Sequence, residues 1–155
     1  MINNASAISL TNTTETSLKK FDLMNSINGR GTWLVSKLAL PHLRESARKK
    51  RNPHILVMSP PLDLRPMWFE NHVGYTMAKY AMSLCVLGWF FFKEKKFMIT
   101  GLAGELKGDG IAVNALWPLT AIETSAMSNV IGTVFVRLTK RHEQDGKDPN
   151  SSNLG

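Results

Sequence analysis

The chain has 155 residues, 43% of them hydrophobic, and a formal net charge of +7. This is the size of one domain with enough apolar residues for a core. Its only cysteine, Cys85, excludes an intrachain disulfide, and its four histidines lack the spacing of a metal site. The basic runs are not interleaved with aromatic residues, so nucleic acid is not an expected partner. No apolar run reaches the roughly 20 residues of a membrane helix, so no membrane span is expected.

The first part of the chain predicts a strand end followed by a long, interrupted helix. Residues 1–6 are expected to end a strand and turn into a polar loop. Apolar residues then recur at helical spacing from Ser17 to Leu43. Gly29 and Gly31 interrupt this helix, and Pro41 is expected to bend or restart it near its end.

The middle of the chain predicts two further strands with a helix between them. The run HILVMS, residues 54–59, is typical of a strand buried on both faces of a sheet. The pattern from Tyr75 to Gly88 is helical, and residues 99–110 indicate a helix end followed by a glycine turn. Residues 111–118 are a second short buried strand. Strand, helix, strand, helix and strand in this order predict an α/β fold with a parallel sheet.

Tyr75 and Lys79 place a phenol and an ammonium four residues apart, and therefore on one face of the predicted helix. One interpretation is a partly buried tyrosine beside a solvated lysine. The other is an acid–base pair, in which the cation favours the phenolate and lowers its pKa. Such a tyrosine could exchange a proton with a carbonyl or alcohol oxygen. The pair alone does not decide between them.

Taken together, five motifs resemble those of the short-chain dehydrogenase/reductase family over residues 3–128. They are NNAS at 3–6, SINGRGTWL at 26–34, Ser59, the pair Tyr75-x-x-x-Lys79, and VNALWPLTAIET at 113–124. The resemblance implies a partial Rossmann-type parallel sheet with flanking helices. It also implies hydride transfer between NAD or NADP and a small-molecule carbonyl/alcohol substrate, and a homo-oligomer as a further expected partner.

The resemblance implies roles for four catalytic residues. Tyr75 would be the general acid/base, and Lys79 would lower its pKa and bind the nicotinamide ribose. Asn28 would kink its helix and hold a water in the proton relay. Ser59 would orient the substrate, but relatives usually place this serine closer to the tyrosine, in a Ser-Ser pair. Here Ser59 lies 16 residues before Tyr75 and Pro60 follows it, so Ser59 either serves from a shifted position or only ends a strand.

The resemblance also implies residues that contact the cofactor, in addition to Tyr75 and Lys79. Asn3 and Ala5 would meet its ribose and adenosine side. Pro118, at the end of the last strand, would also contact the cofactor, and the Ile122 backbone and the Thr124 hydroxyl would reach the carboxamide and the phosphates.

Two departures from the family pattern favour an alternative function. The glycine-rich loop that binds the pyrophosphate is not present among the 155 residues, so the cofactor site is expected to be incomplete. Residues 89–101 are an insertion that must loop out or break the helix register. The expected organisation is a truncated dehydrogenase domain over 1–128 and a weakly structured tail over 129–155. The alternative is a catalytically inactive fragment or splice product, at most an interaction module.

The resemblance implies a peroxisomal or mitochondrial setting, and without it a cytoplasmic one is the natural expectation. The sequence leaves open the substrate, the choice between NAD and NADP, and the oligomeric state.

Overall fold

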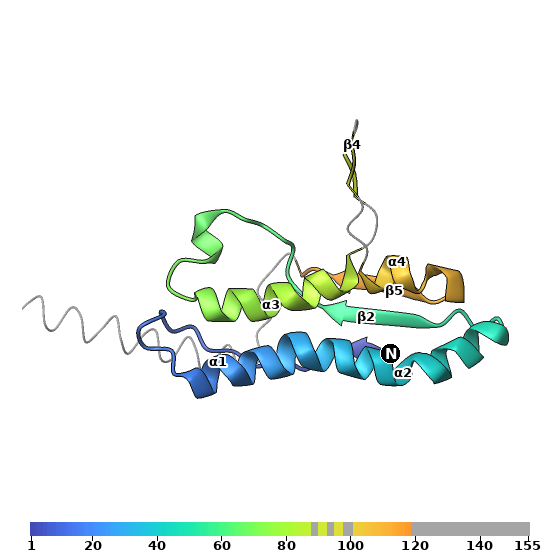
Figure 1. The fold of residues 1–155 in the computed structure, drawn as a ribbon, viewed down its shortest axis with the longest axis horizontal. Coiled ribbons are helices and arrows are strands. Elements are labelled where there is room, and N and C mark those ends of the chain that lie inside the picture. Colours follow the sequence, from blue (N-terminus) through green and yellow to red (C-terminus); the bar gives the residue numbers. More distant parts are fainter. Residues whose placement is uncertain (88–89, 93–94, 98–100, 119–155) are drawn as a thin grey trace, which may run out of the picture. The chain divides into compact units, whose positions relative to one another are not determined.

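The computed structural model of the protein describes residues 1–87, 90–92, 95–97 and 101–118 (Figure 1). The chain divides into two units, Met1–Leu119 and Thr120–Gly155, and the described residues belong to the first. Its elements are β1 (Ile2–Asn3), α1 (Leu18–Asn25), the π-helix η1 (Ser26–Gly31), α2 (Thr32–Arg48), β2 (His54–Met58), the 3₁₀ turn η2 (Pro66–Trp68), α3 (Val73–Val86), β3 (Phe90–Phe92), β4 (Lys95–Phe97), α4 (Leu102–Glu105), the 3₁₀ turn η3 (Lys107–Asp109) and β5 (Ala112–Leu116).

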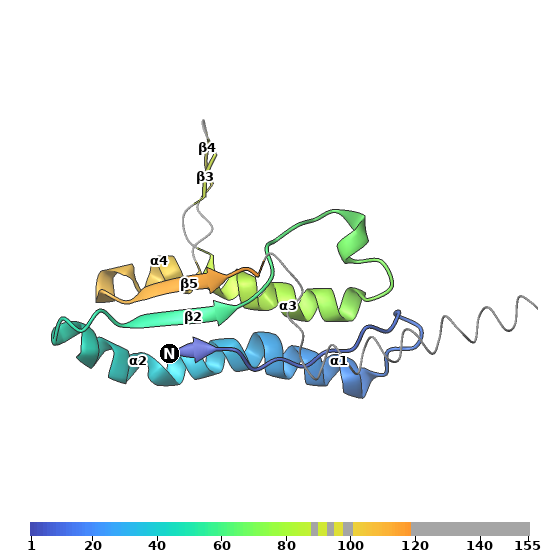
Figure 2. The same ribbon diagram turned by 180° about the vertical axis from the view of Figure 1, so that it is seen from behind.

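The centre of this unit is a parallel sheet of three strands in the order β1-β2-β5 (Figure 2). Ile2 of β1 lies opposite Leu56 of β2, and Val57 of β2 lies opposite Ala115 of β5. The strands run in the same direction, and helical segments connect them. The predicted α/β fold, a partial Rossmann-type parallel sheet with flanking helices, is therefore confirmed.

The core lies on one face of this sheet. Ile55, Val57 and Val113 are buried there against side chains of α3 and α4, and leucines of α2 pack onto the same cluster. The strand residues between them face the other side of the sheet and are less buried; Leu116, for example, is 47% exposed. The expectation that residues 54–59 are buried on both faces is wrong, because the helices of the described part of the chain pack on one side.

The first long helix is distorted where the glycines occur. Residues 26–31 form a π-helical turn between α1 and α2, so the predicted interruption is confirmed. A β-carbon at Gly29 would lie 2.8 Å from the Ala81 β-carbon, which shows how closely this turn approaches α3. Pro41 lies inside α2, which continues from Thr32 to Arg48. The helix therefore does not restart at the proline.

Helix α3 ends at Val86, and the chain returns to that point at Gly101. The Gly101 amide donates to the Leu87 carbonyl at 2.5 Å. A β-carbon at Gly101 would lie 2.8–2.9 Å from three carbonyl oxygens at the end of α3, so only glycine fits. Within the insertion, β3 and β4 form an antiparallel pair with Phe90 opposite Phe97, a pair that the sequence analysis does not predict.

No helix in the described residues combines the length and the apolar character that crossing a membrane requires. The predicted tail over 129–155 lies outside the described residues.

Candidate active site

Lys79 lies at the carboxyl end of the sheet. Its ammonium donates to the Met58 carbonyl at 3.2 Å and to the Ser6 hydroxyl at 3.5 Å. Met58 is the last residue of β2, and Ser6 follows β1. The Met82 sulfur lies 3.4 Å away on the same helix. The lysine thus bridges the segments that leave two neighbouring strands, at the edge where ligands of open parallel sheets bind.

Tyr75 lies one turn before Lys79 in α3, so the two side chains share one helix face. The Tyr75 hydroxyl has no hydrogen-bond partner among the described residues, and burial raises the pKa of its phenol. Burial also lowers the pKa of Lys79. In this arrangement desolvation, not the neighbouring cation, dominates the pKa of Tyr75. The tyrosine is therefore protonated at neutral pH and is able to donate.

Asn28 is fully buried in the π-helical turn and holds the segment that follows β1. Its side-chain oxygen accepts from the Ala7 amide at 2.7 Å, and its side-chain nitrogen donates to the Ala7 carbonyl at 3.0 Å. Both backbone groups of Ala7 are therefore satisfied by one side chain, as a neighbouring strand would satisfy them. This clamp fixes the loop that carries Ser6 beside Lys79.

Asn3 and Ala5 lie on either side of the end of β1. Asn3 is buried, and its side-chain nitrogen donates to the Ser36 hydroxyl of α2 at 2.9 Å. This bond ties the edge strand to the helix, and it leaves the amide oxygen and the second N–H of the Asn3 side chain for a cofactor contact. Ala5 is exposed beyond the strand.

Ser59 follows β2 directly and is 2% exposed. Its amide donates to the Leu116 carbonyl at 3.2 Å, which places it beside the end of β5. Its buried hydroxyl has no hydrogen-bond partner among the described residues. Pro118 is exposed just beyond the same end of β5. Ile122 and Thr124, the other predicted cofactor contacts, lie outside the described residues.

The structure thus brings Asn28, Ser59 and Lys79 to the carboxyl ends of β1 and β2. Sequence reasoning did not identify Ser6 and Ala7, although both lie in or next to the quoted NNAS motif. Their roles depend on contacts with residues 21 and 73 positions away. No local pattern reports such contacts.

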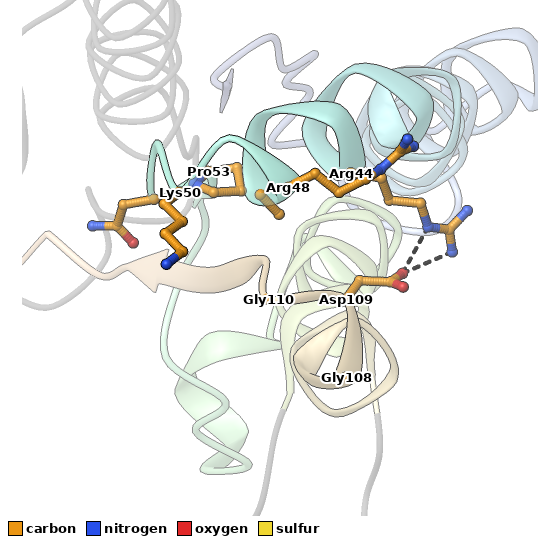
Figure 3. Close-up of a pocket in the computed structure, with 9 residues that line it drawn as sticks. Arg44, Arg48, Lys50, Pro53, Gly108, Asp109 and Gly110 are labelled. Carbon is orange, nitrogen blue, oxygen red and sulfur yellow. Dashed lines mark hydrogen bonds and ion pairs between the residues drawn. The ribbon is translucent and has the colours of Figure 1, made fainter.

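A hollow lies at the opposite end of the sheet, where the strands begin (Figure 3). It is lined by Arg44, Ala47, Arg48, Lys50, Asn52, Pro53, Gly108, Asp109 and Gly110. Arg44 points to Asp109, and the two side chains form an ion pair at 2.8 Å. None of the predicted catalytic residues lies here. Among the described residues, no group of three histidine, cysteine or acidic side chains could hold a metal ion.

Similarity to known proteins extends over most of this chain. It is 54% identical over 133 residues to hydroxysteroid dehydrogenase-like protein 2 of Danio rerio, and 51% identical over 132 residues to that of Homo sapiens. These matches cover 86% and 85% of this chain but only 28% and 27% of the relatives. The chain therefore spans about a quarter of the length of these curated relatives. A scan against protein-family models finds no match.

Solved structures show the same likeness. A putative dehydrogenase from Xanthomonas campestris has a TM-score of 0.67 and 44% identity over 82% of this chain and 40% of its own. A short-chain dehydrogenase from Mycobacterium thermoresistibile has a TM-score of 0.66 and 45% identity, over 84% of this chain and 40% of its own. The 3-ketoacyl-(acyl-carrier-protein) reductase of Brucella melitensis, solved with NADH, has a TM-score of 0.57 over 76% of this chain and 43% of its own. At 24% identity, this last likeness supports the fold alone.

Proposed function

Since the chain belongs to the short-chain dehydrogenase/reductase family, we propose that it is an NAD- or NADP-dependent oxidoreductase. It interconverts a carbonyl and an alcohol in a small molecule. The observation that carries this proposal is the position of Lys79. Its ammonium lies at the carboxyl end of β2, one helical turn after Tyr75.

In the direction of reduction, the Tyr75 hydroxyl donates a proton to the substrate oxygen. A reduced nicotinamide supplies the hydride when it is bound. Burial favours the protonated phenol, so the proton is present at neutral pH. The phenolate left behind is stabilised by the Lys79 ammonium on the same helix face, because opposite charges attract strongly where water is excluded.

The residues around Lys79 fit a nicotinamide cofactor with a polar ribose. The lysine has three donors, and its neighbours at the sheet edge are a backbone carbonyl, a serine hydroxyl and a thioether. An ammonium with such partners can exchange one of them for a ribose hydroxyl. Asn28 supports this function by fixing the Ala7 segment, and Ser59 offers an unpaired hydroxyl for the substrate oxygen.

The test is the substitution Tyr75→Phe in a chimera, in which the chain is joined to a glycine-rich pyrophosphate-binding segment typical of the short-chain dehydrogenase/reductase family. Oxidation of NADH and NADPH is followed with a panel of carbonyl compounds that includes a ketosteroid. A general acid contributes about 10²–10⁴-fold, so a loss of at least the lower value is expected while dinucleotide binding persists. Asp109→Asn, at the other end of the sheet, is the control. If Tyr75→Phe kept more than about a tenth of the rate, the proton would come from another group.

A second candidate function is a non-catalytic module that binds copies of this chain or its relatives. It is favoured by exposed apolar side chains on α1 and α2: Leu18, Leu23, Trp33, Val35 and Leu38. Exposed apolar residues mark an interface when they form a continuous patch, and sedimentation tests whether these residues do. Calorimetry with NAD(H) and NADP(H), combined with sedimentation of the chain, separates the two candidates. Self-association without any dinucleotide binding would favour the module.

A further inference from the structure

Three side chains of α3 hold the loop that connects β2 to this helix. The Thr76 hydroxyl donates to the Trp68 carbonyl, and the Tyr80 hydroxyl donates to the Asp63 carbonyl. The Ser83 hydroxyl donates to the Pro60 carbonyl at 2.6 Å. Residues 76, 80 and 83 are spaced by four and three positions, so they form one stripe along the helix. The loop is bound to this stripe at its beginning, middle and end.

The loop is also braced internally between these points. The Asp63 carboxylate accepts from the Arg65 side chain and, at 2.8 Å, from the Trp68 indole nitrogen. The Phe69 ring meets the Tyr80 ring edge to face, with centroids 5.5 Å apart. Tyr80 therefore contacts the loop through both its hydroxyl and its ring, and the turn from Asp63 to Phe69 is fixed to the helix.

The first bonded carbonyl, that of Pro60, belongs to the residue that follows Ser59. The Ser59 amide is held by the Leu116 carbonyl at 3.2 Å, and the next carbonyl is held by Ser83. The backbone of Ser59 is thus fixed on both sides. Its hydroxyl is buried and unpaired among the described residues, so the chain restrains the position of this group without using its hydrogen-bonding capacity.

The stripe formed by Thr76, Tyr80 and Ser83 lies one residue along the helix from Tyr75, Lys79 and Met82. Successive helical residues are rotated by about 100°, so the two stripes occupy adjacent faces of α3. One face carries the proposed acid–base pair and the other carries the loop that begins at Ser59. A single rigid helix therefore relates Ser59 to Tyr75 and Lys79.

From these contacts we infer that Thr76, Tyr80 and Ser83 are positioning residues, which fix Ser59 relative to Tyr75 and Lys79 by binding the intervening loop to α3. The effect of this positioning on catalysis rests on the proposed function, in which Ser59 orients the substrate. It explains how a serine 16 residues before the tyrosine can serve, since the loop is held at three carbonyls. A misplacement of about 1 Å in a reacting group can cost on the order of 10²-fold in rate.

The inference is tested by nuclear magnetic resonance of the full chain carrying Tyr80→Phe or Ser83→Ala. Each variant removes one hydroxyl and keeps the side chain's packing. Tyr80→Phe is expected to shift the Trp68 indole N–H signal and to speed amide exchange at Trp68, Phe69 and Glu70 about tenfold, for a lost bond of ordinary strength. Ser83→Ala is expected to do the same at the Ser59 amide. Tyr75→Phe, the matched control, should leave all these signals in place.

Unchanged exchange in both variants would overturn the inference, because the loop would then not depend on these bonds. The second criterion is the rate of NADH or NADPH oxidation by the chimera described under the proposed function. Ser83→Ala is expected to lower kcat about tenfold or more with little change in the cofactor KM, and Ser83→Thr should restore part of it. Faster amide exchange in the loop with an unchanged kcat would also overturn the positioning role. If neither the wild-type chimera nor its variants convert any substrate, the proposed function fails. The spectra still decide whether the loop is held by α3.

Discussion

The two ends of the parallel sheet differ in how their polar groups are used. At the carboxyl ends, Asn28 and Lys79 are turned towards backbone atoms of neighbouring segments. At the amino ends, the exposed Arg44 pairs with the partly exposed Asp109. The hollow lies at the second end (Figure 3), whereas the groups that resemble catalytic ones lie at the first. On the proposed function, a concave surface is a weaker guide to chemistry here than polar side chains whose orientation is fixed.

The largest effect on stability is expected from Asn28→Ala at the carboxyl end. The change leaves the Ala7 N–H and C=O without their partner, and an unsatisfied buried group costs about 1–3 kcal/mol. We expect the free energy of unfolding to fall by about 2–4 kcal/mol, measured by denaturant unfolding. Arg48→Ala at the amino end removes only an exposed ion pair and should cost less than about 1 kcal/mol. Equal losses at the two ends would contradict the comparison.

Gly29→Ala should be the next largest change. Its β-carbon would lie 2.8 Å from that of Ala81, and overpacking of this kind typically costs about 1–3 kcal/mol. The double variant Gly29→Ala/Ala81→Gly should recover part of the loss, because it removes the opposing methyl group. Gly108→Ala, in the hollow at the amino end, meets nothing within 4 Å. Thermal unfolding should show it close to wild type, and a comparable loss there would show that the contact at Gly29 is not the cause.

The pH dependence of stability should separate the two members of the proposed acid–base pair. Burial lowers the pKa of Lys79 from its ordinary 10.5, so the unfolded chain binds more protons and Lys79 contributes stability that increases as the pH rises towards that value. Burial raises the pKa of Tyr75 from its ordinary 10.0. The contribution of Tyr75 is therefore fully present below pH 10.0 and is lost as the pH rises through the higher folded value.

Denaturant unfolding across this alkaline range checks both signs. The stability of wild type minus that of Lys79→Met should grow as the pH rises towards 10.5. The corresponding difference for Tyr75→Phe should shrink above pH 10.0. Parallel trends for the two variants would mean that their burial does not control these pKa values.

The smallest effect is expected for Asp109→Asn. The Arg44 Nε and Nη2 atoms both lie 2.8 Å from one Asp109 oxygen, but the side chains are 48% and 33% exposed. Exposed pairs contribute about 0–1 kcal/mol, and salt screens them further. A loss above about 2 kcal/mol in denaturant unfolding would place this pair outside that class.

Local periodicity predicted the elements that carry the site, but not the contacts between them. The helix around Tyr75 and the strands at 54–59 and 111–118 were found because apolar spacing follows the period of each element. Of the two expectations for Pro41, a bend or a restart of the helix, the restart was wrong, because α2 continues through the proline. The β3–β4 pair had no glycine or asparagine turn signal in its sequence.

The contacts of the site depend on residues far apart in the chain. Asn28 and Gly29 were noted for interrupting a helix, yet their partners Ala7 and Ala81 are 21 and 52 positions away. The hydroxyls of Tyr80 and Ser83 likewise reach back 17 and 23 residues. A single sequence gives the chemical type of such groups but not their neighbours, so long-range bonds became visible only in the structure.

The meeting of Leu87 and Gly101 has a consequence for how this gene can change. The two residues are joined by a backbone hydrogen bond, so the two ends of the insertion lie together. The entropic cost of closing a longer segment grows by only about 0.6 kcal/mol per doubling of its length. A change in the length of the insertion should therefore cost little through loop closure, whereas a substitution at Gly101 meets three carbonyl oxygens and should be costly.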